Sequence, residues 1–265
     1  METLMNLPLI SHEIPHSLAR AEHDGDYHIN DYLFILLHRY IEDPIYRDIV
    51  DSYDGFTILD NSCYELGSAL SNDLIADYVE RIKPDVFVLP DVLGNMAETI
   101  DRSLRFLEGY PELESKAMAV IQGNTPEEFK ECYEWFDENC PTLAMIGIPF
   151  CFNWAFKINM TPVQHAMERV DLIYMLLNEC VIRKTTKHHL LGTWWAPEFS
   201  YYHEQKWIYS VDTSNPIAAA IGGDRYPIEW KPKIKFDEFV DMDLKEINID
   251  DIIYNVNVFK EYAKR

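Results

Sequence analysis

Five short apolar runs, each followed by an acid, an amide or a glycine, constrain the fold of this chain most strongly. They are FTILDNSCY at 56–64, VFVLPD at 86–91, AMAVIQG at 117–123, LAMIGIP at 143–149 and WIYSVDTS at 207–214. Strands that are apolar almost throughout are buried on both faces, which is typical of parallel sheets covered by helices. Three further runs bring the predicted strands to eight: LPLIS at 7–11, YLFILL at 32–37 and HHLLGTW at 188–194.

Helix-start signals separate these predicted strands. Asn95, Thr125 and Thr161 each stand three residues before a Glu or Gln, the spacing of a capping box. Apolar residues at helical spacing over 74–82 and 96–108 give each of these segments one face to bury. We therefore expect helices between the strands.

Strand and helix alternate along the whole chain, which indicates parallel βαβ units. Eight such units close into a (β/α)8 TIM barrel, an α/β fold that typically takes ~250 residues. The 265 residues contain no internal repeat, low-complexity run or Gly/Ser linker. We therefore expect a single domain over 1–265, with an acidic helical segment at 236–265 packed on the outside. A doubly wound open sheet is the alternative.

The charge of the chain limits its partners. With 23 basic and 45 acidic residues the formal net charge is −22, so the surface repels a phosphate backbone at long range. A nucleic-acid partner would need local basic patches, and an ordinary solvated face is the alternative for each candidate. The candidates are two clusters: Arg183, Lys184, Lys187, His188 and His189, and Lys231, Lys233 and Lys235.

Cysteine usage and hydropathy indicate the compartment. Five cysteines without a CxxC pair predict a reducing compartment, by default the cytoplasm. No run approaches the ~20 apolar residues that a membrane-spanning helix needs, so we expect no membrane association. We expect no structural metal either, because four of the cysteines are spaced too widely for a zinc site and the histidines favour structural roles. These residues are Cys132, Cys140, Cys151 and Cys180, and His28, His38, His188, His189 and His203.

Five polar or glycine positions fall where the predicted strands end, at the rim on which barrel enzymes carry their active sites. Two carboxylates there can perform glycosidic chemistry, one as nucleophile and the other as general acid or base. A third carboxylate beside an amide can bind the edge of a base. For each residue taken alone, a helix cap or a loop hydrogen bond is the alternative. The five are Asp60, Asp91, Gln122, Gly147 and Asp212.

In their order along the chain, these motifs resemble the tRNA-guanine transglycosylase family, barrel enzymes that exchange guanine for a 7-deazaguanine base. The segment 60–64 resembles the family's Asp-Ser-Gly-Gly-Phe/Tyr, and Asp91 resembles the aspartate of its Asp-Glu-Cys. The segment 120–123 is similar to its Ile-Val-Gln-Gly and 190–192 to its Leu-Met-Gly. The segment 210–212 resembles its Gly-Val-Asp.

The resemblance implies a role for each matching residue. Asp60 is the general acid or base, and Asp91 and Gln122 hold the Watson–Crick edge of the exchanged base. The resemblance also implies that Asn61 contacts the base, that the ring of Tyr64 stacks on it, and that the backbone of Gly147-Ile148 contacts it.

The resemblance leaves the nucleophile between two positions of the eighth strand end. Strict register with the family puts Asn215 at the nucleophile, and an amide cannot attack an anomeric carbon. Asp212 is the only carboxylate on that strand end. We therefore expect Asp212 to form the covalent bond to the sugar.

The chain lacks the family's zinc cluster and its C-terminal extension, and so is more similar to a short, zinc-free, phage-type branch that modifies DNA. The resemblance implies DNA and a free 7-deazaguanine base as partners, no cofactor, and the cytoplasm of a bacterium or phage-infected host cell. tRNA is the close alternative substrate. An N-glycoside hydrolase and a catalytically silent binding barrel are alternative functions, and both a homodimer and a partner protein stay open.

Overall fold

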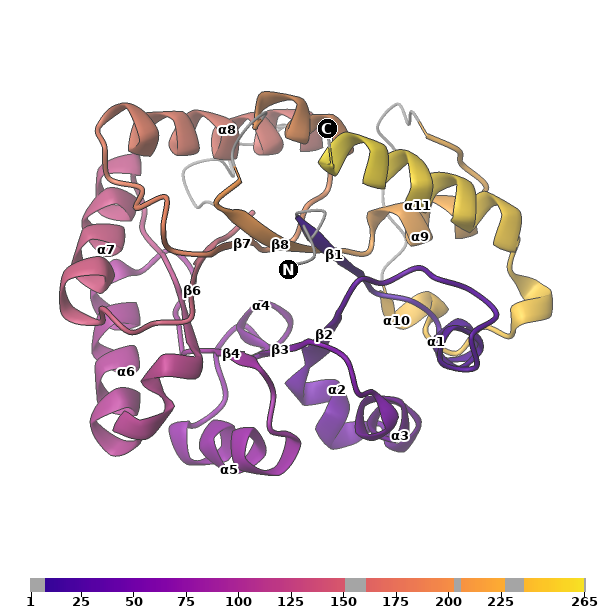
Figure 1. The fold of residues 1–265 in the computed structure, drawn as a ribbon, viewed down its shortest axis with the longest axis horizontal. Coiled ribbons are helices and arrows are strands. Elements are labelled where there is room, and N and C mark those ends of the chain that lie inside the picture. Colours follow the sequence, from indigo (N-terminus) through magenta and orange to yellow (C-terminus); the bar gives the residue numbers. More distant parts are fainter. Residues whose placement is uncertain (1–7, 151–160, 203–205, 227–235, 265) are drawn as a thin grey trace, which may run out of the picture.

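The computed structural model describes residues 8–150, 161–202, 206–226 and 236–264, and it confirms the predicted TIM barrel (Figure 1). Eight parallel strands form one sheet in the order β1-β8-β7-β6-β5-β4-β3-β2. Sequential strands are neighbours, and the last strand pairs with the first. This order excludes the doubly wound alternative, in which the strand order reverses at a switch point.

Each strand overlaps one of the eight predicted runs, and the helices form a ring around the strands (Figure 1). The strands are β1 (Leu9–His12), β2 (Leu33–Leu36), β3 (Thr57–Asp60), β4 (Val86–Val88), β5 (Ala117–Val120), β6 (Met145–Ile148), β7 (His188–Leu190) and β8 (Ile208–Thr213). The α-helices are α1 (His16–His23), α2 (Leu37–Glu42), α3 (Pro44–Ser52), α4 (Cys63–Leu66), α5 (Asn72–Ile82), α6 (Met96–Gly109), α7 (Pro126–Asn139), α8 (Pro162–Asn178), α9 (Asn215–Ile221), α10 (Phe236–Phe239) and α11 (Ile249–Ala263). Among the described residues, the 3-10 helices are η1 (Pro111–Lys116), η3 (Ala196–Tyr201) and η4 (Leu244–Glu246).

The helix starts follow from their capping residues. The side chains of Asn95, Thr125 and Thr161 each accept the backbone N–H three residues further on, and so begin α6, α7 and α8. Across the described ranges, no helix combines the length and the apolar character needed to span a bilayer.

Alternation along the strands divides the core into two layers. Ile58, Val88 and Val120 belong to a cluster enclosed by the barrel, whereas Leu59 and Phe87 pack in the larger cluster beneath the helices. An inward-facing position near the carboxyl end of a strand therefore projects into the mouth of the barrel, the end at which the strands run into the βα loops.

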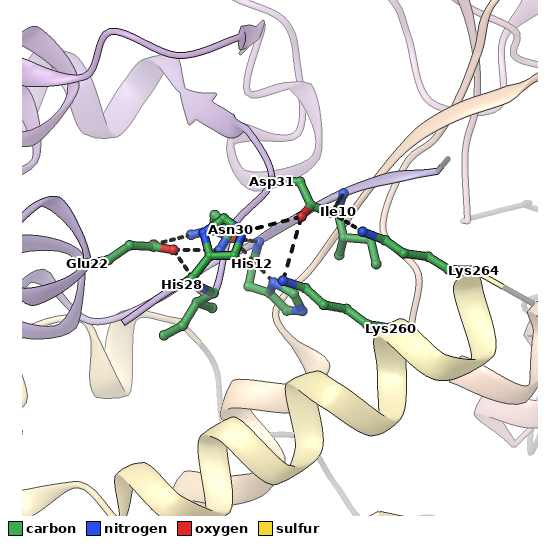
Figure 2. Close-up of polar contacts among 9 residues, drawn as sticks. Ile10, His12, Glu22, His28, Asn30, Asp31, Lys260 and Lys264 are labelled. Carbon is green, nitrogen blue, oxygen red and sulfur yellow. Dashed lines mark hydrogen bonds and ion pairs between the residues drawn. The ribbon is translucent and has the colours of Figure 1, made fainter. Parts of the chain in front are cut away.

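The barrel closes between β1 and β2, the two ends of the hydrogen-bonded strand order, largely through side chains (Figure 2). The N–H of Ile10 donates to Asp31 Oδ2 at 3.1 Å, and the N–H of His12 donates to Asn30 Oδ1 at 2.5 Å. The N–H of Asp31 returns a hydrogen bond to the carbonyl of Ile10 at 2.8 Å. These contacts take the place of a regular ladder at the seam.

Lys260 of helix α11 and Lys264, the residue that follows the helix, supply the positive charges at this seam (Figure 2). Lys264 Nζ lies 2.8 Å from Asp31 Oδ2 and Lys260 Nζ lies 3.7 Å from Oδ1, and all three side chains are largely buried. Desolvation raises the pKa of Asp31, but the hydrogen bond from Lys264 and the charge of Lys260 outweigh it and lower the pKa overall. Desolvation and the charge of Lys260 lower the pKa of the neighbouring His12 to about 3, so this imidazole is neutral. The C-terminal end of α11 therefore stabilises the seam between β1 and β2.

Replacing Asp31 by Asn leaves both lysines without their counter-charge. We expect Asp31→Asn to lower the free energy of unfolding by about 2–4 kcal/mol at pH 7, measured by urea denaturation. Because the folded-state pKa of Asp31 lies below its ordinary value, the loss should be full above about pH 4 and disappear as pH falls through the folded-state pKa. Asp26→Asn, at an exposed position, is the control, and an equal loss there would contradict the account.

Candidate active site at the barrel mouth

Carboxyl groups from several strands gather at the barrel mouth. Asp60 ends β3 two residues beyond the inward-facing Ile58, and Asp212 lies in β8 two residues beyond Ser210. Asp60 senses the negative charges of Glu65, Asp91 and Asp212. The residues that the sequence places at different strand ends therefore share one electrostatic environment.

Asp60 is the most strongly perturbed of these carboxyl groups. Its side chain is buried, and its Oδ2 accepts the N–H of Ser62 at 2.6 Å. Desolvation, followed by the charge of Glu65, raises the pKa of Asp60 well above its ordinary value, against the hydrogen bond from Ser62. A carboxyl group that the fold favours in its protonated form has the property that a general acid needs.

Glu65 adds a further carboxyl group that the sequence analysis missed. Desolvation raises its pKa to about 7, with the charges of Glu13 and Asp212 adding to the effect, although the side chain keeps an exposed surface. It lies on α4, which Figure 1 shows toward the middle of the ring. The same short helix carries Tyr64, whose 65% exposure leaves most of its surface open to solvent.

The ends of β3, β4 and β5 are joined by a buried polar network. Asn61 Nδ2 donates to Asp91 Oδ1 at 2.8 Å, and Gln122 Nε2 donates to Asp91 Oδ2 at 2.7 Å. Gln122 Oε1 accepts the N–H of Gly94 at 3.0 Å. Desolvation raises the pKa of Asp91, while the hydrogen bonds from Asn61 and Gln122 oppose that rise. The structure thus brings these three predicted residues together, already paired with one another.

Asp212 is held at the mouth by one of its oxygens. Its Oδ1 accepts the N–H of Gly192 at 2.9 Å and lies 3.1 Å from Nε2 of His189, and its side chain is 14% exposed. Gly192 has a φ of 63°, the left-handed conformation that favours glycine, and this conformation presents its N–H to the carboxylate. Sequence reasoning missed both donors, because nothing in the segment 188–192 indicates which residue of β8 lies opposite.

Asn215, the alternative to Asp212, is occupied elsewhere. It begins α9 and is buried, and its amide contacts the hydroxyl of Tyr226. In the amide orientation that satisfies both ends, its nitrogen donates to that hydroxyl and its oxygen accepts from Trp194 Nε1 at 2.8 Å. These contacts fit a residue that fastens the start of α9.

Strand β6 contributes Gly147 and Ile148, whose carbonyls serve the sheet. The carbonyl of Gly147 accepts the N–H of Ile121 at 3.1 Å, and that of Ile148 accepts the N–H of Leu191 at 3.0 Å. The side chain of Ile148 packs in the helix-facing cluster. A Cβ at position 147 would lie 2.7 Å from Leu191 Cδ1 and 3.1 Å from Val120 Cγ2, so the packing of the barrel interior favours glycine there whether or not a base binds.

The arginine and lysine residues of the basic cluster, at 183–187, do not border the mouth. The cluster precedes β7 and enters it, so its cationic part lies at the amino ends of the strands, opposite the carboxylates. His188 and His189 are fully buried in the barrel wall, and Arg183 pairs with Asp137 at 2.6 Å. The other candidate cluster, Lys231, Lys233 and Lys235, lies outside the described residues.

The cysteines that the structure describes are free thiols. In the described ranges, no group of three or more His, Cys, Asp or Glu side chains is arranged to hold a metal ion. Cys151 and His203 lie outside those ranges.

A scan against models of known protein families matches none of them, and a search of curated proteins finds no match. The function is therefore inferred from the chemistry of the mouth.

Because the pKa of Asp60 is raised, replacing this carboxyl group by an amide should stabilise the fold, whereas most substitutions destabilise a protein. A carboxyl group whose pKa rises on folding destabilises the fold increasingly as pH rises above about 4, its ordinary value. Asn keeps an oxygen for the Ser62 N–H without the charge. We expect Asp60→Asn to raise the free energy of unfolding by about 1–3 kcal/mol at pH 7 and by much less at pH 4, measured by urea denaturation.

Asp54→Asn, at an exposed position, serves as the control and should change little at either pH. A loss of stability in Asp60→Asn at pH 7 would show that the carboxylate stabilises the fold. It would contradict the inference that the fold favours the protonated form of Asp60.

Proposed function

We propose that the protein is a base-exchanging transglycosylase that replaces guanine by a 7-deazaguanine base in DNA. One observation carries the proposal: a carboxyl group with a strongly raised pKa, Asp60, shares the mouth with Asp212, whose Oδ1 is held by a backbone N–H. Two carboxyl groups whose environments differ in this way can divide the roles of general acid and nucleophile at a glycosidic bond.

The chemistry follows from these two groups. Asp212 Oδ2 attacks C1′ of the deoxyribose, the bond from C1′ to the base breaks, and the Asp60 carboxyl gives its proton to the departing base. A nitrogen of the incoming base then attacks C1′, the bond to Asp212 breaks, and the Asp60 carboxylate takes the proton from that nitrogen. Two inversions at C1′ preserve the stereochemistry, and no oxidant or reductant is consumed.

Asp91 and Gln122 support recognition of the base. Each oxygen of Asp91 accepts one amide hydrogen bond, and the Cys63 thiol and the backbone N–H of Asp91 also interact with this carboxylate. The adjacent N–H and amino donors of a guanine-like base match a carboxylate acceptor, and an amide N–H matches its carbonyl. A base would therefore have to displace some of these contacts to reach Asp91 and Gln122.

The negative charge of the mouth limits how a nucleic acid can approach. Asp60, Glu65, Asp91 and Asp212 lie close enough for their charges to interact, and phosphates are repelled by such a site. A nucleotide would therefore have to be flipped out, so that its base and sugar enter while the flanking phosphates stay outside. DNA rather than tRNA is favoured only by the resemblance to short, zinc-free enzymes.

Hydrolysis of an N-glycosidic bond is the second candidate. It is favoured by the buried, mutually paired state of Asp91 and Gln122, because a hydrolase needs only Asp60 and Asp212 and uses water as the acceptor.

Incubation of the protein with DNA or tRNA and a radiolabelled 7-deazaguanine base tests the proposal. We expect label to enter DNA, and we expect Asp60→Asn and Asp212→Asn each to slow incorporation by roughly 10³-fold or more. Asp171→Asn, on an exposed position of α8, is the matched control and should be unaffected.

Release of guanine without incorporation would instead support the hydrolase. Label in tRNA alone would identify tRNA instead of DNA as the substrate, and the proposed base-exchange chemistry would stand. If neither base release nor incorporation occurs, the proposed function is wrong.

A further inference from the structure

A buried chain of side chains runs from the barrel interior to the mouth. His189 Nδ1 lies 2.8 Å from Ser210 Oγ, and His189 Nε2 lies 3.1 Å from Asp212 Oδ1. His189 and Ser210 are both fully buried, whereas Asp212 is 14% exposed. The ring of Phe34 stacks on the imidazole with 5.3 Å between centroids and 8° between planes, which restricts rotation of the ring.

An irregularity in the sheet creates this chain. The pairing of β7 with β8 shifts between His188 and His189, so that His189 lies directly opposite Ser210. Bulges that re-aim a side chain in this way are frequent next to active sites. The shift, an extra residue in β8, places Ser210 rather than Tyr209 opposite His189, on the strand that carries Asp212.

The three groups constrain the proton positions on the imidazole. An ionised carboxylate can only accept, so a hydrogen bond to Asp212 requires the proton on His189 Nε2. In neutral imidazole Nδ1 is then an acceptor, and the hydroxyl of Ser210 can donate to it. A hydroxyl can donate or accept, so Asp212 sets this tautomer and Ser210 accommodates it.

Ser210, His189 and Asp212 are the residue types of a serine hydrolase's catalytic triad, but their order from the interior to the mouth is reversed. In such a hydrolase the serine faces the substrate and the carboxylate is buried behind the histidine. Here Ser210 is buried and Asp212 faces the mouth. The group placed to react is therefore the carboxylate, and the histidine acts on it.

We propose that His189, with its tautomer set by Asp212, is a positioning residue that holds Asp212 by Oδ1 and presents Oδ2 to the sugar. The N–H of Gly192 donates to the same Oδ1 at 2.9 Å, so both contacts leave Oδ2 available. The catalytic consequence rests on the proposed function, whereas the tautomer does not.

The first test is a ¹⁵N-detected histidine spectrum of the full-length protein, with resonances assigned through His189 variants. We expect His189 to carry its proton on Nε2 at pH 7, and we expect Asp212→Ala, which removes the acceptor of that proton, to produce a mixture of tautomers. A proton on Nδ1 alone in the wild-type protein would overturn the inference, whatever the protein catalyses.

The second test compares His189→Gln with His189→Asn. Glutamine places an amide N–H near the position of Nε2 and can still donate to Asp212, whereas asparagine reaches only the position of Nδ1. With DNA and the radiolabelled 7-deazaguanine base as probes, we expect His189→Asn to lower kcat by roughly 10–100-fold with little change in KM, and His189→Gln to recover most of that loss.

A purely structural role predicts that the two variants lose activity equally, and that result would overturn the inference. If wild-type protein does not exchange bases, the proposed function fails, and the spectrum alone then decides whether His189 holds Asp212. If His189→Asn does not fold, the spectra of wild type and Asp212→Ala still decide between the two tautomers.

Discussion

Closure of a parallel sheet forces the polar residues that end its strands into one small, poorly solvated volume. The charge of a carboxyl group is costly in such a place, and Asp60 responds by a strongly raised pKa. Asp91 is held by two amide donors instead, and Asp212 by a backbone N–H beside an imidazole. Closure itself depends on the pairing of Asp31 with Lys260 and Lys264, because β1 and β2 meet mainly through side chains. The chemistry of the mouth therefore depends on a charge cluster on the outside of the barrel.

The local signals in the sequence were sufficient to predict the fold. Runs that are apolar on both strand faces indicate buried parallel strands, and Thr125 and Thr161 begin their helices where the capping pattern places them. Asp60, Asp91 and Gln122 could also be placed, because the carboxyl ends of parallel strands meet at one end of a barrel. The pairing of Asp91 with Asn61 and Gln122 before any ligand binds could not be predicted, because it depends on side-chain directions in three strands.

Two features could not be predicted from the sequence: the register between neighbouring strands, and the end of the barrel at which a given residue lies. The contact between His189 and Asp212 arises from a one-residue shift between β7 and β8, and a single residue decides which side chain faces the interior. The basic residues at 183–187 are contiguous in the sequence, yet they lie at the amino ends of the strands, where they cannot contact a substrate at the mouth. Composition alone cannot separate the two ends of a barrel.

The proposed chemistry depends on the raised pKa of Asp60, to which the charge of Asp212 contributes. A ¹³C NMR titration of protein labelled at aspartate side chains tests it directly, with Asp60→Asn identifying the resonance. The account predicts that Asp60 titrates well above the ordinary range for aspartate, and that Asp212→Asn moves its midpoint downward because the charge of Asp212 contributes to the shift. A midpoint near the ordinary value of about 4, unchanged by Asp212→Asn, would contradict it.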